Sequence, residues 1–480
     1  MSHILTELTP KQKALKINLD RHIYGTFAEI GAGQETVRFF YRAGGASGTL
    51  AKAMSAYDKD FSDAIYGKEE DNRYVTEDRL NKMLNHEIGL IEERLDKEQH
   101  AGKSFFSYAN TVTTIDYAKK YKGQGWVGIK FQAAPNEDYN NIVLHVRFKE
   151  NSAQLQQETL GVLGVNLIYG AYHHTDNPRE LVRSLYDSLD HDQLEIDMIN
   201  FSGPRFKYVD NRLMSLQLLR NQMTEAVMFG PDGYNILPAD LLYKKNIFAM
   251  RGSFRPVTNV NIDMLHSGLD MFRKDYPQIS DDNLQVLFEI TLTNLRQEGE
   301  IDERDFLNRA DILCKLGYNV LISNYQEYYK LVDYFSEYTR NRTQIGLAMG
   351  VNNLLAVFQE EYYSDLGGGI MEAFGKLFKR NVKVYLYPYK AQKEETLLTS
   401  QNLKVSFHLK DLYKFFKRNG KIEDIQDYNP KNLKIHSRKI LKQINNCETG
   451  WEESLPGDVA TIIKEKGMFG YDEEKCKFVI

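Results

Sequence analysis

The chain has 480 residues, enough for two or three domains, because a single hydrophobic core rarely grows beyond about 250 to 300 residues. Its hydrophobic (42%), charged (26%) and aromatic (12%) fractions are typical of a folded globular protein and exclude a disordered chain. The net charge of -5 is too weak to attract nucleic acid or anionic lipid over the whole molecule.

The first 25 residues carry charges at short intervals and have no apolar core of signal-peptide length. No run approaches the roughly 18 apolar residues of a membrane span. Three cysteines, Cys314, Cys447 and Cys476, are far apart and unpaired in their spacing, which predicts free thiols in a reducing compartment and gives no metal signature. We therefore expect a cytoplasmic protein that has no membrane contact and holds no metal.

Residues 1–194 are predicted to form an α+β domain that contains a glycine-rich segment. A short strand at 27–33 precedes helical material that extends to residue 67, and a helix starts at Thr76, whose hydroxyl suits a helix N-cap. Three β-rich runs then follow, at 104–118, 125–132 and 141–150, and their spacing predicts neighbouring strands of one sheet. A mostly apolar helix at 154–174 is predicted to be buried on most sides.

Residues 195–395 alternate short apolar runs with amphipathic helices, the pattern of a parallel sheet with helical crossovers. An open doubly wound sheet is favoured over a closed barrel, because the helices between the runs differ in length and a barrel needs regular units. The remaining segment, 396–480, is predicted to be basic and mainly helical. The predicted strands of the second domain are LEIDMINFSG, EAVMFGPDG, NIFAMRGS, LQVLFEITL, YNVLISN, IGLAMGV and VKVYLYPY.

Two glycine clusters lie close together in the first domain, as FAEIGAGQET and GGASGTLAK. Amides at a helix N-terminus beside glycines can cradle a phosphate, which makes Gly31, Gly33, Gly45 and Gly48 candidate ligand-binding residues. However, the first cluster lacks the third glycine of a dinucleotide fingerprint, and the second lacks the GK[ST] order of a P-loop. Tight turns are the favoured interpretation, and an anion-binding loop is the alternative.

Loops after the strands of a parallel sheet are the usual ligand sites, and here nearly every one carries glycine, serine, asparagine or arginine. Arg251 and Arg255 could clamp a phosphate or carboxylate, and replacing either is expected to weaken anion binding without unfolding the protein. Glu289, within VLFEITL, needs a partner or a catalytic role if it is buried, so we predict it or Asp263 as a base. Further predicted ligand-binding residues in these loops are Gly230, Asp232, Ser323 and Asn324.

Between Lys404 and Lys442 the chain has eleven lysines and arginines against four acidic residues. Such a segment could attract RNA, or its lysines could meet the protein's own acidic surface. The second interpretation is favoured because few aromatic residues are interleaved to stack bases. Nucleic acid is therefore an unexpected partner.

A further set of strings is spread over most of the chain: FAEIGAGQE, GGASGTLAK, SAYD, FSDAIYG, GWVGIKFQ, LGVNLIYGA, DNRLMSLQL, RGSFRPVTN and GGGIMEAFGKLF. Together they resemble a widespread family of uncharacterised bacterial cytosolic proteins, some of which are labelled nicotinate-nucleotide adenylyltransferases. That enzyme family uses an H-x-G-H motif and an S-x-T-x-x-R motif, and the nearest strings here, HSGL at 266 and SFRPVT at 253, match neither.

The leading functional hypothesis is an enzyme or binding protein for a small anionic metabolite, a nucleotide or a sugar phosphate. A non-catalytic, homo-oligomeric scaffold is the rival class, and a nucleotidyltransferase is the further alternative that the resemblance implies. No particular cofactor is indicated.

Overall fold

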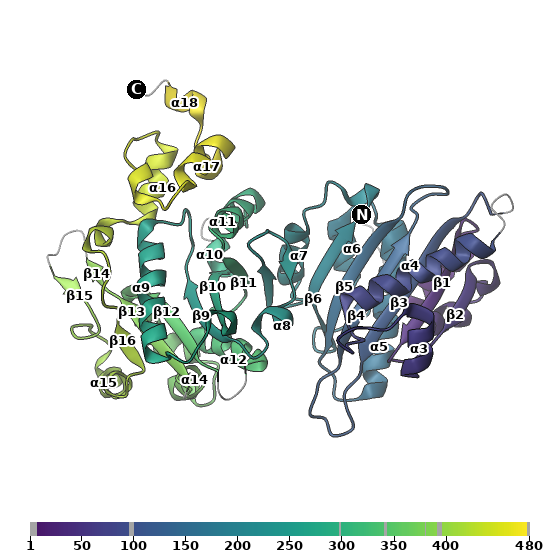
Figure 1. The fold of residues 1–480 in the computed structure, drawn as a ribbon, viewed down its shortest axis with the longest axis horizontal. Helices are drawn as coiled ribbons and strands as arrows, with labels where there is room; N and C mark the ends of the chain where they lie inside the picture. The colour runs from purple at the N-terminus through teal and green to yellow at the C-terminus, as the bar shows by residue number, and fades with distance from the viewer. Residues whose placement is uncertain are drawn as a thin grey trace, which may run out of the picture. The chain divides into compact units, whose positions relative to one another are not determined.

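A computed structural model describes residues 7–95, 100–296, 299–339, 343–379, 381–390 and 396–477 of the chain (Figure 1). It divides into two compact units, residues 1–227 and 228–480. The first boundary thus lies later than the predicted residue 194. The reason is that β6 (Leu194–Ser202) pairs antiparallel with β5 (Asn140–Phe148) and closes the first sheet instead of opening the second.

The first unit holds a six-stranded mixed sheet in the order β2-β1-β3-β4-β5-β6. Strand β1 (Ile23–Ile30) runs parallel to β2 (Leu50–Met54) and β3 (Ser104–Thr113), and the remaining pairs are antiparallel, with β4 (Gln124–Phe131) between β3 and β5. The prediction that three β-rich runs are neighbours in one sheet is confirmed. Residues 50–54, which were predicted within helical material, form a strand.

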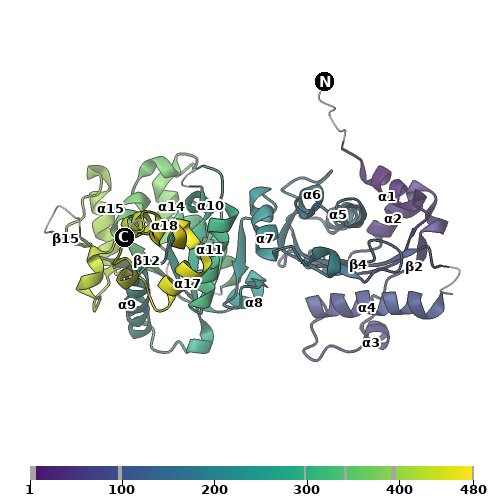
Figure 2. The same cartoon turned by 90° about the horizontal axis from the view of Figure 1, so that it is seen from above.

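Helices cover both faces of this sheet, with α1, α2, α5 and α6 on one side and α3 and α4 on the other (Figure 2). Helix α4 (Glu77–Arg94) starts where predicted, because the Thr76 hydroxyl accepts the backbone N–H of Arg79. Helix α5 (Ala153–His173) is buried along most of its length, also as predicted. The other helices are α1 (Pro10–Leu19), α2 (Glu35–Ala43), α3 (Lys59–Tyr66), α6 (Pro178–Ser184) and α7 (Asn211–Arg220).

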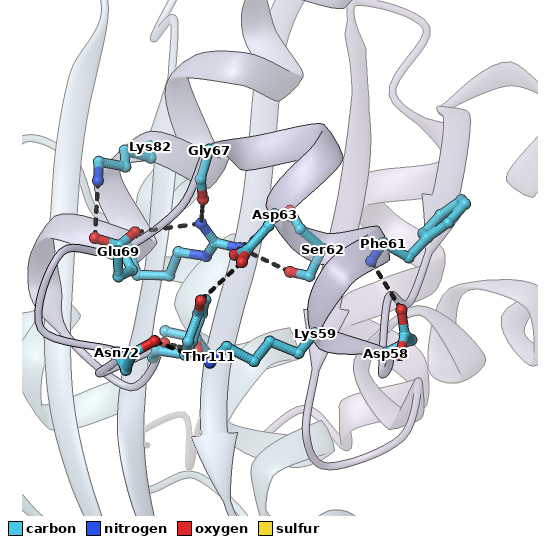
Figure 3. A network of polar contacts seen from close by, with 12 residues as sticks. Asp58, Lys59, Phe61, Ser62, Asp63, Gly67, Glu69, Asn72, Lys82 and Thr111 are labelled. Atoms are coloured by element: carbon cyan, nitrogen blue, oxygen red, sulfur yellow. Dashed lines mark hydrogen bonds and ion pairs between the residues drawn. The ribbon is translucent and has the colours of Figure 1, made fainter.

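The charged loop between α3 and α4 is anchored by a buried arginine, Arg79, on α4. Its guanidinium donates to the carbonyl of Gly67 (2.5 Å), to the hydroxyl of Ser62 (2.8 Å) and to the carboxylate of Glu69 (3.2 Å). Figure 3 shows these acceptors converging from the loop and from the end of α3. The Arg79 side chain is only 1% exposed, and these bonds tie the loop and α3 to α4.

The second unit holds an eight-stranded open sheet in the order β16-β13-β12-β9-β10-β11-β7-β8. From β9 the chain builds outward through β10 and β11, then returns to the other side of β9 and builds outward through β12, β13 and β16. The five neighbouring pairs among these six strands are parallel. This is the 3-2-1-4-5-6 order of doubly wound folds, so the predicted α/β class and the preference for an open sheet are confirmed.

Most residues of these strands are buried, as expected for a parallel sheet covered on both faces, and this is why their sequences read as continuous apolar runs. The strands are β7 (Ala226–Phe229), β8 (Asn235–Ile236), β9 (Asn246–Arg251), β10 (Leu284–Thr291), β11 (Asn319–Ser323), β12 (Ile345–Gly350), β13 (Val382–Tyr387) and β16 (Ile422–Asp424), with a separate β14–β15 pair (Tyr389–Lys390, Leu397–Leu398). The helices are α8 (Pro238–Leu242), α9 (Asn259–Asp275), α10 (Leu292–Leu295), α11 (Glu303–Lys315), α12 (Tyr328–Tyr338), α13 (Val351–Val357), α14 (Gly369–Leu377), α15 (Lys410–Arg418), α16 (Ser437–Asn445), α17 (Val459–Lys466) and α18 (Glu473–Lys477).

The C-terminal segment is mainly helical, and two of the three cysteines are bonded to each other. Cys447, after α16, forms a disulfide with Cys476 in α18, whereas Cys314 is a buried free thiol in α11. The expectation of three free thiols is therefore wrong for this pair. A separation of 29 residues carries no pairing signal, and the two cysteines meet only because the chain folds back between them. Within the described residues, no helix is long and apolar enough to span a bilayer.

Candidate ligand site at the switch point of the parallel sheet

A cavity of about 390 Å³ opens at the carboxyl ends of the central strands of the second unit, a volume within the range of small-molecule sites. Arg251 and Thr291 are the last residues of β9 and β10, Gln326 follows β11, and Asn353 lies in α13 directly after β12. Strands β9 and β12 are the neighbours between which the strand order reverses, and ligands of doubly wound folds bind at such a reversal. The lining residues are Arg251, Gly252, Ser253, Thr291, Thr293, Asn294, Gln326, Glu327, Tyr328, Asn353, Ala356, Val357, Tyr362 and Tyr363.

Arg251 forms a two-pronged ion pair with Glu289 in the wall of this cavity. Strand register places the two residues side by side, and Nε and Nη2 of Arg251 donate to the two carboxylate oxygens at 2.8 and 2.9 Å. The Ser323 hydroxyl donates to the same carboxylate at 2.6 Å. The Glu289 side chain is 0% exposed and that of Arg251 is 7% exposed. The structure thus gives Glu289 the arginine partner that its burial requires.

Tyr328 completes the environment of Arg251, whose guanidinium carbon lies 4.2 Å from the centre of the tyrosine ring. Burial would lower the pKa of Arg251, but the charge of Glu289 raises that pKa above its ordinary value, so the guanidinium stays charged. Burial raises the pKa of Tyr328 to about 12. Its neutral hydroxyl accepts from the side-chain amide of Asn353 at 3.2 Å and keeps its own proton to donate.

Two more tyrosines that line the cavity, Tyr362 and Tyr363, belong to the short helical turn Glu360–Tyr363. Tyr363 is buried and donates its hydroxyl to the carbonyl of Val357 at 2.8 Å. Tyr362 is 51% exposed, so its ring is accessible to solvent and to a ligand. The lining of the cavity therefore combines a fixed cation with aromatic rings.

The loop after β9 is held close to the cavity by its own hydrogen bonds. Asn294 donates to the carbonyl of Gly252 at 3.3 Å, and Arg309 donates to the carbonyl of Ser253 at 3.2 Å. Phe254 is buried with a φ of 46°, a left-handed conformation that is costly for a residue other than glycine. Strain of this kind is concentrated at functional sites, which agrees with a ligand-binding role for the loop.

The predicted clamp of two arginines is not formed, because Arg255 does not line this cavity. Its Nε donates to Asp305 at 2.7 Å, and it lines a separate cavity of about 790 Å³ beside α11 and the C-terminal helices. Phe254, which lies between the two arginines, has a left-handed φ of 46°, so the backbone does not continue the extended path of β9. A spacing of four residues, which would align side chains on a helix, therefore points these two to different places.

The second predicted base, Asp263, lies on α9 outside the cavity. It accepts the hydroxyl of Tyr387 at 2.5 Å and the backbone N–H of Asn429 at 2.9 Å. These bonds tie the end of β13 to the C-terminal segment. His266, in the string nearest to the H-x-G-H motif, lies 3.0 Å from the Tyr318 hydroxyl and is likewise not among the lining residues.

The remaining predicted residues of this unit are divided between the site and the edges of the fold. Ser323 donates its hydroxyl to the carboxylate of Glu289. Asn324 is exposed and does not line the cavity. Gly230 and Asp232 belong to the turn of the β7–β8 hairpin, where Asp232 accepts the backbone N–H of Tyr234 at 3.0 Å. The loop after β7 leads into a hairpin rather than into a crossover helix, and so it lies apart from the site.

Sequence reasoning missed most of the aromatic and amide lining, namely Gln326, Tyr328, Asn353 and Tyr362. The tyrosine-rich strings YQEYYK and EEYYSD were the available signal, because tyrosines in turns beside strand ends commonly line sites. The tyrosine spacing in YQEYYK also fits the buried face of a helix. Periodicity alone therefore did not distinguish tyrosines that line a site from tyrosines that pack in a helix.

The glycine-rich segment of the first unit does not leave an open anion cradle. Glu29, at the end of β1, accepts the backbone N–H groups of Thr36 (3.1 Å) and Val37 (2.9 Å) in the first turn of α2. A carboxylate of the chain thus occupies the place that a phosphate would take. Gly31 has a φ of 100° and Gly33 a φ of 71°, which agrees with the favoured interpretation of tight turns.

Gly31 and Gly48 are expected to respond oppositely to alanine. In Gly31→Ala the new Cβ would lie 1.8 Å from the carbonyl oxygen of Val112 in a left-handed conformation, so we expect a loss of more than about 2 kcal/mol in unfolding free energy. At Gly48 a Cβ meets nothing within 4 Å, so Gly48→Ala should be neutral or stabilising by up to about 1 kcal/mol. Urea denaturation of both variants measures this, and equal stabilities would contradict the assigned turn geometry.

Fold and site together define a doubly wound α/β unit with a ligand crevice at its switch point. No family model and no curated protein matches the chain. Solved structures with local similarity include a competence-damaged protein (CinA) superfamily protein from Enterobacter cloacae, at 14% identity and a TM-score of 0.26, over 34% of this chain and 93% of that one. Another is the competence/damage inducible protein CihA from Agrobacterium tumefaciens, at 16% identity and a TM-score of 0.24, over 33% and 93%. TM-scores this low support no conclusion about activity.

Proposed function

We propose that the second unit binds a nucleotide in the crevice at the ends of β9, β10 and β12. The observation that carries this proposal is the position of the cavity at the strand reversal of a 3-2-1-4-5-6 sheet, with an arginine and tyrosine rings facing it. A sugar phosphate would use the same cation, but it would leave the aromatic walls without a planar partner.

The tyrosine walls suit a nucleobase. The accessible face of Tyr362 offers a stacking surface, and Asn353 and Asn294 offer amide groups for the polar edge of a base or for ribose hydroxyls. The hydroxyl of Tyr328 adds a donor. Aromatic faces with a few fixed polar groups form the typical lining of a site for a planar heterocycle.

Arg251 suits the phosphate. Two of its five N–H donors bind the carboxylate of Glu289, and a third binds the carbonyl of Gln326 at 2.7 Å. Among the described residues, two donors therefore remain for a ligand oxygen. Because Glu289 balances the charge of Arg251, the site favours the lower charge of a monophosphate, about -1.5 to -2 at pH 7, over that of a polyphosphate. We therefore expect a nucleoside monophosphate to bind more tightly than the triphosphate.

Binding, rather than a particular reaction, is the proposed function. A general base needs a free lone pair directed at the substrate, and the oxygens of Glu289 are already engaged by Arg251 and Ser323. The role predicted for Glu289 from the sequence is thus better described as holding Arg251 in place.

A thermal-shift screen with nucleoside mono-, di- and triphosphates, nucleosides and phosphosugars tests the proposal. We expect a monophosphate to raise the melting temperature, and Tyr362→Ala to weaken its binding about 5- to 100-fold through the lost stacking surface. Tyr234→Ala is the matched control, because Tyr234 is exposed (74%) in the β7–β8 hairpin and lies outside the cavity. Equal binding by both variants, or stabilisation by phosphosugars alone, would refute nucleotide binding here.

A further inference from the structure

A second hollow, of about 470 Å³, lies between α15 and the chain segment that precedes it in the C-terminal region. We call it the α15 groove. Its floor is Tyr413, whose hydroxyl donates to the carbonyl of Ser400 at 2.8 Å and joins the two walls. The groove is lined by Ser400, Gln401, Asn402, Leu403, Lys404, Val405, Phe407, Lys410, Tyr413, Lys414 and Lys417.

One wall of the α15 groove is a ridge of lysines. Lys410, Lys414 and Lys417 are spaced four and three residues apart, so they share one face of the helix, and Lys404 stands on the opposite wall. Asp411 pairs with Lys414 at 3.0 Å, but its side chain is almost fully exposed and it does not line the groove. No acidic side chain is among the described residues that line it.

Two of the other acidic residues of this basic segment pair with lysines that do not line the groove, Glu423 with Lys383 at 2.5 Å and Asp427 with Lys274 at 3.4 Å. Asp424 accepts the hydroxyl of the lining residue Ser400 at 2.7 Å.

Two of the four groove lysines have a partner: Lys414 pairs with Asp411, and Lys417 donates to the side chain of Gln401 at 2.8 Å. The carboxylates beside the groove are thus fewer than its lysines, and positive charge is left for an external anion.

An aromatic side chain projects at the same place. Phe407 is 85% exposed on the rim of the groove, although a phenylalanine gains about 2 kcal/mol when it is buried. Cations that follow a backbone, beside an accessible aromatic face, are the two elements of a single-strand nucleic acid site. The small number of interleaved aromatic residues was the reason for setting nucleic acid aside, and the structure shows that one of them, Phe407, is exposed beside the lysines.

We propose that the α15 groove binds single-stranded nucleic acid, with the lysine ridge on the phosphates and a base stacked on Phe407. The base faces of a duplex are covered, so a duplex would lose the stacking. An acidic peptide would use the lysines but not the ring.

Fluorescence anisotropy with a fluorescein-labelled 15-nucleotide oligo(dT) and the full chain tests this proposal. We expect saturable binding at low salt, with log K falling against log[salt] at a slope of about -2 to -3, because each neutralised phosphate contributes about -0.7. In the double variant Lys410→Gln/Lys414→Gln the slope should become shallower by about 1.4. Phe407→Ala should weaken binding about 5-fold or more without changing the slope.

The matched control is Lys11→Gln/Lys68→Gln, which removes the same charge from exposed positions in the first unit. If it reduces binding as much as the groove variant, the attraction is non-specific and the proposal is overturned. A duplex that binds as tightly as the single strand, or a poly-glutamate peptide that displaces the oligonucleotide at equal charge, would also overturn it. If Phe407→Ala binds the oligonucleotide as tightly as the wild type, no base stacks on Phe407, and the proposal that the partner is a single-stranded nucleic acid is overturned.

Discussion

Replacing Arg251 with methionine is expected to lower the unfolding free energy of the 228–480 unit by about 3 to 5 kcal/mol. The substitution leaves Glu289, at 0% exposure, as a buried charge that keeps the Ser323 hydroxyl as a side-chain donor among the described residues. An unpaired buried carboxylate costs far more than a lost surface ion pair. The prediction from the structure thus differs from the expectation from sequence that Arg251 could be replaced without affecting the fold.

Urea denaturation of a matched set of variants measures the effect. The double variant Arg251→Met/Glu289→Leu removes both charges and should recover most of the stability, since apolar replacements of buried pairs are often neutral. Arg273→Met breaks the exposed pair with Asp281 and should cost less than about 1 kcal/mol. If Arg251→Met were no more destabilising than Arg273→Met, the buried ion pair would not exist as described.

The stability of the first unit is expected to fall by about 3 kcal/mol as the pH rises from 4.5 to above 7, through Glu29 alone. Burial raises the pKa of Glu29 from 4.5 to about 7, against the opposing hydrogen bonds from Val37 and Thr36. The folded state then binds a proton more tightly than the unfolded state. This stabilisation is complete below pH 4.5 and is lost as the pH rises through 7.

Urea midpoints of the wild type and of Glu29→Gln at pH 5, 6, 7 and 8 test this dependence. The variant cannot titrate at this position and should show a flatter profile than the wild type. Glu158→Gln, an exposed carboxyl on α5, is the control and should keep the wild-type profile. A wild-type stability that rises between pH 5 and 7, with the same rise in Glu29→Gln, would contradict the assignment.

Periodicity and composition were sufficient for most of the second unit. Continuous apolar runs predicted buried parallel strands. Arg251 was predicted as an anion ligand, and Glu289 as a base or as a buried acid in need of a partner, but the two were not predicted to pair. Strand register then placed them side by side. This part is predictable because burial on both faces and the location of sites at strand ends are properties of the fold class.

The sheet to which residues 194–202 belong, the position of Arg255 and the role of Glu29 depend on tertiary contacts. The spacing of residues in a single sequence does not reveal such contacts. The apolar run at 194–202 could pair with either sheet, and only its antiparallel register with β5 decides. Arg255 diverges from Arg251 because of one left-handed residue, Phe254. Glu29 could not be recognised as the carboxylate that fills the helix terminus, because it comes before the glycines rather than among them.

A crystal structure of the protein soaked with a nucleoside monophosphate tests the central claim most directly. We expect difference density in the crevice after β9, β10 and β12, with the phosphate within hydrogen-bonding distance of Arg251 and the base against Tyr362 or Tyr328. Density for the nucleotide at another place, such as the α15 groove, with the crevice filled only by water, would contradict the account.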